Sequence, residues 1–172
     1  AAMMVNEFIS LVPDECPENT EGYEGFYHLT DISGECELAT ANFIIRDHDK
    51  TKFEERKTIF ASIADKLNEK YDENRFNVEI EDNYCNMREM IEKEMHIVDN
   101  AINAMKNAGV EPKVSPIRGG TDGARLSFDG LLCPNICTGS EGHHGRNEFA
   151  CIEDMEKIVE ILINLVKIYA EN

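Results

Sequence analysis

Residues 115–149 hold the side chains of this sequence that are best suited to chemistry. Arg118 stands directly before Gly119, Gly120 and Thr121, at the predicted start of a short helix. A glycine turn that enters a helix leaves backbone N–H groups free at the positive end of the helix dipole, where anions bind. Because Arg118 adds a positive charge beside that turn, the stretch predicts a seat for a carboxylate or a phosphate.

A second feature lies nearer the end of the same stretch. His143 and His144 are adjacent and stand between Gly142 and Gly145. Neutral imidazole is a common zinc ligand, so this loop suggests a metal site. From the residues alone, an exposed loop histidine that binds nothing is the alternative.

A purely structural interpretation of the first feature also stays open. Gly119 and Gly120 would then only form a tight turn, while Thr121 or Asp122 caps the following helix. The two interpretations are compatible, since a capped helix can still border a binding site.

Composition narrows the classes of function. The 172 residues include 34 acids and 17 bases, for a net charge of -17, which disfavours nucleic acid and anionic membrane surfaces as partners. A hydrophobic content of 42% is enough for a real core. The six cysteines are scattered and are expected to be reduced thiols, with a buried pair as the alternative. No apolar run is long enough to span a membrane. These features predict a cytoplasmic protein.

The first half of the chain predicts helix, strand, strand, helix, strand. This order is that of a split βαβ, ferredoxin-like unit that lacks its first strand. Two runs rich in aromatic and branched residues predict a hairpin around Ser33-Gly34-Glu35, and strict alternation predicts the last strand. The predicted elements are a helix over 1–11, strands over 25–32 and 38–46, a helix over 49–71 that Asp49 caps, and a strand over 76–81.

The second half predicts alternating helices and extended segments, typical of part of an α/β domain. Residues 152–170 predict a final helix with one apolar stripe made of Met155, Val159, Leu162, Val166 and Tyr169. The other predicted elements are a helix over 94–108 that ends at Gly109, an extended stretch over 110–114, a helix over 121–128 and a buried strand over 132–137. We place the boundary between two domains near residue 85, so that they span residues 1–84 and 85–172.

Several motifs together resemble one family of peptidases. The strongest are P-I-R-G-G-T-D-G-A-R-L-S-F at 116–128, C-P-N at 133–135 and H-G-R-N-E-F at 144–149. The segments T-E-G-Y-E-G-F-Y-H-L at 20–29 and F-I-I-R-D-H-D at 43–49 extend the likeness towards the start of the chain. With F-E-E-R-K at 53–57 and N-M-R-E at 86–89, the chain resembles the peptidase T family of tripeptide aminopeptidases, which are cytosolic members of the aminoacylase and carboxypeptidase-like zinc peptidases.

The resemblance implies a fold and an activity. In that family a catalytic α/β domain that holds two zinc ions is interrupted by a ferredoxin-like lid domain. It implies that residues 1–84 are a partial lid or dimerisation domain and that residues 85–172 are the C-terminal part of the catalytic domain. The implied fold class is therefore α/β, with an α+β lid, and the implied substrate is a short peptide from which the N-terminal residue is hydrolysed.

The resemblance also implies roles for single residues. His144 matches the C-terminal zinc-binding histidine of the family. Arg118, with the Gly119-Gly120-Thr121 turn, would fix the far carboxylate of the substrate, and such a seat at a set distance from zinc would measure peptide length. Arg46 corresponds to a lid arginine that faces substrate, although an ion pair with Asp47 or Asp49 is the alternative.

Two neighbours of His144 have open roles. His143 has no counterpart in the family motif, and it either shapes the loop or is only exposed. Glu148 either supports the zinc ligand or is a solvated carboxylate. The residues just before His144, and Asn147 after it, depart from the family pattern, which bears on substrate preference.

Most of the ligands that a two-metal site needs are missing from this sequence. Hydrolysis by two metal ions needs several carboxylates and histidines, a water and a general base. This chain supplies one expected ligand, and the family's other ligands would precede Ala1. We therefore expect the chain to be a fragment and to be inactive on its own. Alternatives are a non-catalytic dimerisation or peptide-binding module, pairing as a homodimer through the lid, and a relative that binds peptides without cleaving them.

Overall fold

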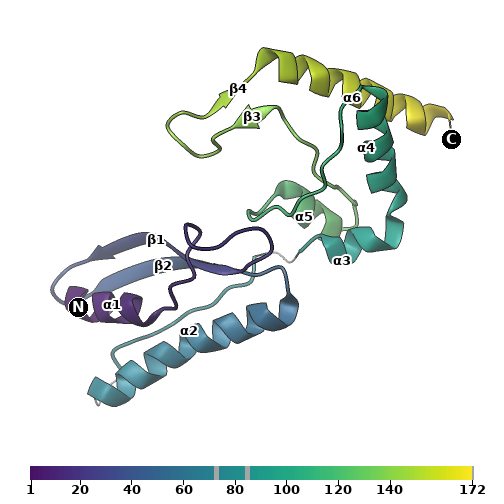
Figure 1. Ribbon diagram of the computed structural model, residues 1–172. Coiled ribbons are helices and arrows are strands. Elements are labelled where there is room, and N and C mark those ends of the chain that lie inside the picture. Colours follow the sequence, from purple (N-terminus) through teal and green to yellow (C-terminus); the bar gives the residue numbers. More distant parts are fainter. Residues whose placement is uncertain (72–73, 84–85, 172) are drawn as a thin grey trace. The chain divides into compact units, whose positions relative to one another are not determined.

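The computed structural model describes residues 1–71, 74–83 and 86–171. They form two compact units (Figure 1). The first unit comprises Ala1–Asn83 with Pro116–Arg118, and the second comprises Tyr84–Ser115 with Gly119–Asn172. The domain boundary predicted near residue 85, and Cys85 itself, lie outside the described residues, and the assignment of the two domains as lid and catalytic part stays a prediction.

The described residues of the first unit form two helices and one β-hairpin, which are the first four of the five elements that the sequence predicts. Its elements are α1 (Ala2–Leu11), β1 (Phe26–Gly34), β2 (Ala39–Arg46) and α2 (Lys50–Tyr71). The two strands pair in antiparallel fashion, with Phe26 opposite Arg46. Helix α2 begins after Asp49, whose carboxylate accepts a hydrogen bond of 3.0 Å from the backbone N–H of Lys52. This is the cap that the sequence predicts.

The hairpin turn lies later in the chain than predicted. Ser33 and Gly34 belong to β1, and the backbone N–H of Glu35 donates to the carbonyl of Leu38 to close the turn. A Cβ on Gly34 would stand 2.6 Å from the Cβ of Ala39 on the opposite strand. The glycine therefore permits a close cross-strand pair and does not form the turn itself.

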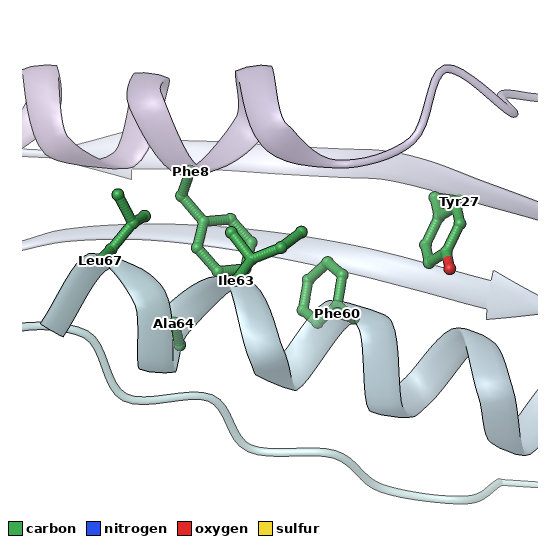
Figure 2. Packing of buried hydrophobic residues seen from close by; sticks show 6 residues of the cluster. All are labelled: Phe8, Tyr27, Phe60, Ile63, Ala64 and Leu67. Atoms are coloured by element: carbon green, nitrogen blue, oxygen red, sulfur yellow. The ribbon is translucent and has the colours of Figure 1, made fainter. Parts of the chain in front are cut away.

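The core of the first unit lies between the hairpin and the two helices. Figure 2 shows Phe8 of α1 pointing toward the side chains of α2 that face the hairpin. The rings of Phe8 and Phe60 meet edge to face with centroids 5.1 Å apart. Each large apolar side chain buried in this way contributes about 1.5–3 kcal/mol. The buried members are Phe8, Tyr27, Phe60, Ile63, Ala64 and Leu67.

The strand predicted over 76–81 is wrong, because these residues join no β-ladder in the described part of the chain. The segment is nevertheless held against the core, where Phe76 and Val78 pack. The Asn68 side chain of α2 satisfies the backbone hydrogen bonds of Phe76 that a paired strand would otherwise satisfy. Its Oδ1 accepts from the N–H of Phe76 at 2.8 Å, and its Nδ2 donates to the carbonyl of Phe76 at 2.9 Å. Alternation thus marks a half-buried segment here, but not a paired one.

The second unit is mainly helical, with one very short hairpin. The helix predicted over 94–108 is present as α4, which is followed by Gly109 with a φ of 73°. That left-handed residue ends the helix in the way expected of glycine. The elements are α3 (Arg88–Ile91), the 3-10 turn η1 (Glu92–Glu94), α4 (His96–Asn107), α5 (Asp122–Phe128), β3 (Ser140–Glu141), β4 (Phe149–Ala150) and α6 (Ile152–Glu171).

Helices α4 and α6 pack against each other around Ala104 and Ile161, which are 0% and 1% exposed. The side of α6 that makes this contact carries Ile158, Leu165 and Ile168. The apolar stripe predicted for this helix faces the other way: Met155, Val159, Leu162, Val166 and Tyr169 are 45–68% exposed. Helix α6 is apolar on more than one side, so periodicity alone could not select the side that packs on α4.

The buried strand predicted over 132–137 is also wrong, since these residues join no ladder among the described residues. Their backbone contacts helix α5 instead. The N–H of Cys133 donates to Ser127 Oγ at 3.0 Å, and the Ser127 hydroxyl, fully buried, donates to the carbonyl of Gly123 at 2.7 Å. The mixed α/β class is confirmed, while its sheets are smaller than the sequence predicts.

Candidate functional site

Arg118 belongs to the first unit, although it is far from the rest of that unit in sequence. Its Nη1 and Nη2 donate to the carbonyl oxygen and the hydroxyl of Thr20, in the loop that precedes β1. The guanidinium carbon lies 5.0 Å from the ring centroid of Phe26, in a cation–π arrangement. Its Nε is buried and has no hydrogen-bond partner among the described residues. The charge of Arg118 is therefore held in a fixed position.

Arg46 lies beside Arg118. Its Nη1 donates to the carbonyl oxygen of Arg118 at 2.8 Å. The two carboxylates proposed as alternative partners have other roles, because Asp47 pairs with Arg56 at 2.8 Å and Asp49 caps α2. The structure thus places the two predicted arginines in one region of the first unit. The positive charges of both arginines favour an anion in this unit, although the chain as a whole has a net charge of -17.

An ion-pair network of Asp47, Arg56 and Glu15 supports this region and is buried at Asp47. The Asp47 side chain is 2% exposed and accepts from Arg56, which also donates to the carboxylate of Glu15. Burial opposes the charge of Arg56, but the hydrogen bonds that it donates to Asp47 and Glu15, with the negative charges of these carboxylates, outweigh burial and raise the pKa of this guanidinium. A Cβ on Gly25 would stand 2.5 Å from the carbonyl of Arg46, so only glycine fits at that position. The network ties the loop before β1 to the end of β2.

His48 follows Asp47 in the sequence and has a pKa below the ordinary histidine value of 6.5. Desolvation by burial is the main cause, and the positive charge of Arg118 adds to it, while Asp47 acts in the opposite direction. Its ring meets that of Tyr23 edge to face at 5.2 Å between centroids. His48 is therefore neutral near pH 7, and the positive charge of the region comes from the arginines.

The Gly119-Gly120-Thr121 turn belongs to the second unit. Thr121 caps α5, with its Oγ1 accepting from the N–H of Ala124 at 3.2 Å, and it also accepts from the Asn135 side chain at 3.2 Å. The capping interpretation is confirmed, whereas a substrate contact by this turn stays a prediction. Both glycines are exposed, and α5 has only seven residues, which limits its dipole.

His144 lies in the loop between β3 and β4. Its backbone has a φ of 63°, a left-handed conformation that is uncommon outside glycine. Its N–H donates to Glu148 Oε2 at 3.2 Å, and His143 Nδ1 lies 3.6 Å from Glu148 Oε1. Both histidine side chains are exposed. The Glu148 carboxylate thus contacts both histidine residues of the loop.

The donor set for a metal ion is incomplete within the described ranges. An exposed imidazole such as that of His144 fits a single zinc ligand. A zinc site needs at least three protein ligands, and the described residues contain no group of three or more histidine, cysteine, aspartate or glutamate side chains that could hold a metal. His144 therefore fits zinc only as one member of a larger set.

Comparison with known proteins identifies the family. The model of "Peptidase family M20/M25/M40" matches residues 6–168. The chain belongs to this peptidase family. Peptidase T from Clostridium perfringens is 56% identical over 170 residues, which are 98% of this chain and 42% of that protein. Peptidase T from Caldanaerobacter subterraneus is 51% identical over 166 residues, 96% of this chain and 41% of the relative.

Solved structures agree on the fold. A tripeptidase from Staphylococcus aureus aligns with a TM-score of 0.67 at 19% identity, covering 99% of this chain and 46% of that structure. The aminopeptidase PepT from Bacillus cereus aligns with a TM-score of 0.57 at 15% identity, covering 95% of this chain and 44% of that structure. The resemblance inferred from the sequence motifs is confirmed, and this M20 family chain spans about 42% of the length of the curated relatives it matches.

Sequence reasoning missed several residues that position this candidate site. Thr20 holds Arg118 across 98 residues of sequence, and Glu15 joins the Arg56 network across 41. Thr20 lies within a quoted family motif, but nothing in that motif names its partner. Gly123 and Ser127 could have been noticed as the small residues of an otherwise amphipathic helix. None of the helices in the described part of this M20 family chain is long and apolar enough to cross a membrane.

Proposed function

We propose that this chain is the part of a zinc-dependent tripeptide aminopeptidase that supplies His144 to the metal centre and Arg118 and Arg46 to the substrate carboxylate. The observation that carries the proposal is the pairing of the two arginines, in which Arg46 donates to the backbone of Arg118 and Thr20 holds the Arg118 side chain. The names of the relatives, at 56% and 51% identity, support the choice of peptides as substrates.

The arginines would recognise the far end of a short peptide through its carboxylate. Thr20 engages one N–H on each of the terminal nitrogens of Arg118, which leaves a second hydrogen on each for an anion. A hydrogen bond to a charged group contributes about 1.5–3 kcal/mol. Because the chain as a whole repels anions, this local charge is what would let a peptide carboxylate bind. The Gly119-Gly120-Thr121 turn is the proposed neighbour of the bound group.

His144 would hold zinc through one imidazole nitrogen. Zinc, when bound, supplies Lewis-acid activation for peptide hydrolysis. The other ligands, including those of a second ion, would come from elsewhere in the full-length protein. The 172-residue chain by itself is therefore expected to be inactive, and the full-length enzyme to be cytoplasmic.

A homodimer formed through the first unit is a second proposal. The hairpin of β1 and β2 is a two-stranded sheet in the described part of the chain, so each strand has one edge that pairs with no other described strand. Pairing of two such edges would make a continuous sheet. Analytical ultracentrifugation of the 172-residue chain tests this second proposal, and a proline placed in β2 should weaken the dimer. A chain that stays monomeric at all concentrations would contradict dimerisation.

A chimera tests the enzymatic proposal directly. The 170 matching residues of Clostridium perfringens peptidase T are replaced by this chain, and hydrolysis of a tripeptide is measured. The chimera should cleave the N-terminal residue, and His144→Ala should reduce both activity and zinc content. A folded chimera that binds zinc and cleaves no peptide would refute the proposal, as would zinc-dependent cleavage by the isolated chain.

Arg118→Ala separates carboxylate recognition from folding. In the chimera this change should lower kcat/KM for a tripeptide about 10- to 100-fold, as loss of one charged hydrogen bond implies, and should have little effect on the tripeptide amide. Arg125→Ala is the matched control, because that side chain is 82% exposed. Equal losses for the acid and the amide would show that Arg118 does not read the carboxylate.

A further inference from the structure

The carboxylate of Glu148 contacts two successive residues in the loop between β3 and β4. Its Oε2 accepts from the backbone N–H of His144 at 3.2 Å, and its Oε1 lies 3.6 Å from Nδ1 of His143. The loop closes further through the N–H of Gly145, which donates to the carbonyl of Gly142 at 2.9 Å, and through the backbone N–H of Glu148, which donates to the carbonyl of Gly145 at 3.2 Å. Glu148 is thus the side chain that fastens the tip of this loop to its base.

The loop has a particular need for such a contact. His144 is the one non-glycine residue in the described ranges with a positive φ, at 63°. A side chain on a left-handed residue crowds its own backbone, so this conformation is populated only where surrounding contacts favour it. Glycine adopts it freely, and among the other residues asparagine, aspartate and histidine are enriched there, so a histidine is tolerated at this position when its contacts support it. The backbone N–H of the strained residue is the group that Glu148 binds.

The strained conformation has a directional consequence. Backbone dihedrals at His144 set the direction in which its Cβ, and with it the imidazole, leaves the loop. The imidazole itself is exposed, so no packing fixes it. The loop backbone therefore sets the direction of the ring, and Glu148 is a side chain that binds this backbone.

We propose that Glu148 is a positioning residue, which holds His144 in the left-handed conformation by accepting a hydrogen bond from its backbone N–H and so orients the imidazole for metal binding. The metal-binding part rests on the proposed function of His144, whereas the loop conformation does not. The interaction is made with the backbone of the ligand residue and leaves both of its ring nitrogens available. The same carboxylate also contacts His143, so the neighbouring histidine contributes to holding the loop.

The first experiment needs no metal and no activity. Hydrogen exchange of the His144 amide is measured by NMR in the 172-residue chain and in Glu148→Ala, Glu148→Gln and Glu141→Ala variants. Glu148→Ala should speed exchange about fivefold to tenfold, since one exposed hydrogen bond is lost. Glu148→Gln keeps an acceptor oxygen and should exchange like the parent chain. Glu141→Ala removes a neighbouring exposed carboxylate of the same hairpin and should change nothing.

The second experiment tests the consequence for metal binding in the chimera with Clostridium perfringens peptidase T. Glu148→Ala should weaken zinc binding about tenfold, the usual size of the effect when a residue that orients a ligand is lost, and Glu148→Gln should restore it. Unchanged exchange and unchanged zinc affinity in Glu148→Ala would overturn the proposal, as would equal loss in the glutamine variant. If Glu148→Ala speeds exchange but His144→Ala loses no zinc, then Glu148 does hold the loop backbone and the proposed metal role of His144 is wrong.

Discussion

Gly123→Ala should destabilise the second unit, although helix propensity alone predicts the opposite. Gly123 lies in the first turn of α5, where alanine would be favoured by about 0.5–1 kcal/mol. A Cβ at this position would stand 2.5 Å from the carbonyl oxygen of Cys133 and 3.0 Å from Oδ1 of Asn135. Overpacking of this kind costs about 1–3 kcal/mol, because the oxygen belongs to the backbone and cannot rotate away. The net loss of unfolding free energy should be about 1–2 kcal/mol.

Urea denaturation of the 172-residue chain, followed by hydrogen exchange of peptides from α5 and from residues 131–137, measures this effect. With a slope of about 1–2 kcal/mol per molar urea, the midpoint of these peptides should fall by about 0.5–2 M. Exposed Arg125→Ala in the same helix is the control and should leave the free energy of unfolding within about 0.5 kcal/mol of the parent value. A Gly123→Ala chain that is as stable as the parent, or more so, would refute the close approach between α5 and the segment after it.

Two further predictions concern the first unit. Leu67→Ala, at a side chain that is 2% exposed, should lower the free energy of unfolding by about 3 kcal/mol and speed amide exchange in α2 about 100-fold. Exposed Lys66→Ala is the control and should do neither. Equal exchange rates in the two variants would contradict the core described for this unit. His48 has a folded pKa below its ordinary value of 6.5, so the unfolded state binds more protons between these two values, and stability falls as the pH drops below about 6.5. His48→Gln should therefore lose less Tm than the parent between pH 7.5 and pH 5.5, and an identical loss would show that His48 does not contribute.

Local signals in the sequence predicted the helices and the hairpin well. The helices over 2–11, 50–71 and 96–107, and the cap at Asp49, follow from periodicity and from residues that satisfy their own neighbours within a few positions. The strands predicted over 76–81 and 132–137 failed for one reason. A strand exists only when a second segment pairs with it, and alternation reports burial of one face without reporting a partner. In both cases a helix side chain, Asn68 or Ser127, binds the backbone instead.

The sequence by itself determined the family and the residues to examine, and it predicts an anion at Arg118 and Arg46 and a metal at His144. Their motifs are short and local, so no fold is needed to find them. Only the tertiary structure decided that Arg46 donates to Arg118, that Thr20 holds the guanidinium from 98 residues away, and that His144 has a left-handed backbone bound by Glu148. Hydrogen bonds across such separations depend on which elements pack together, and packing is a property of the whole unit that no local pattern encodes.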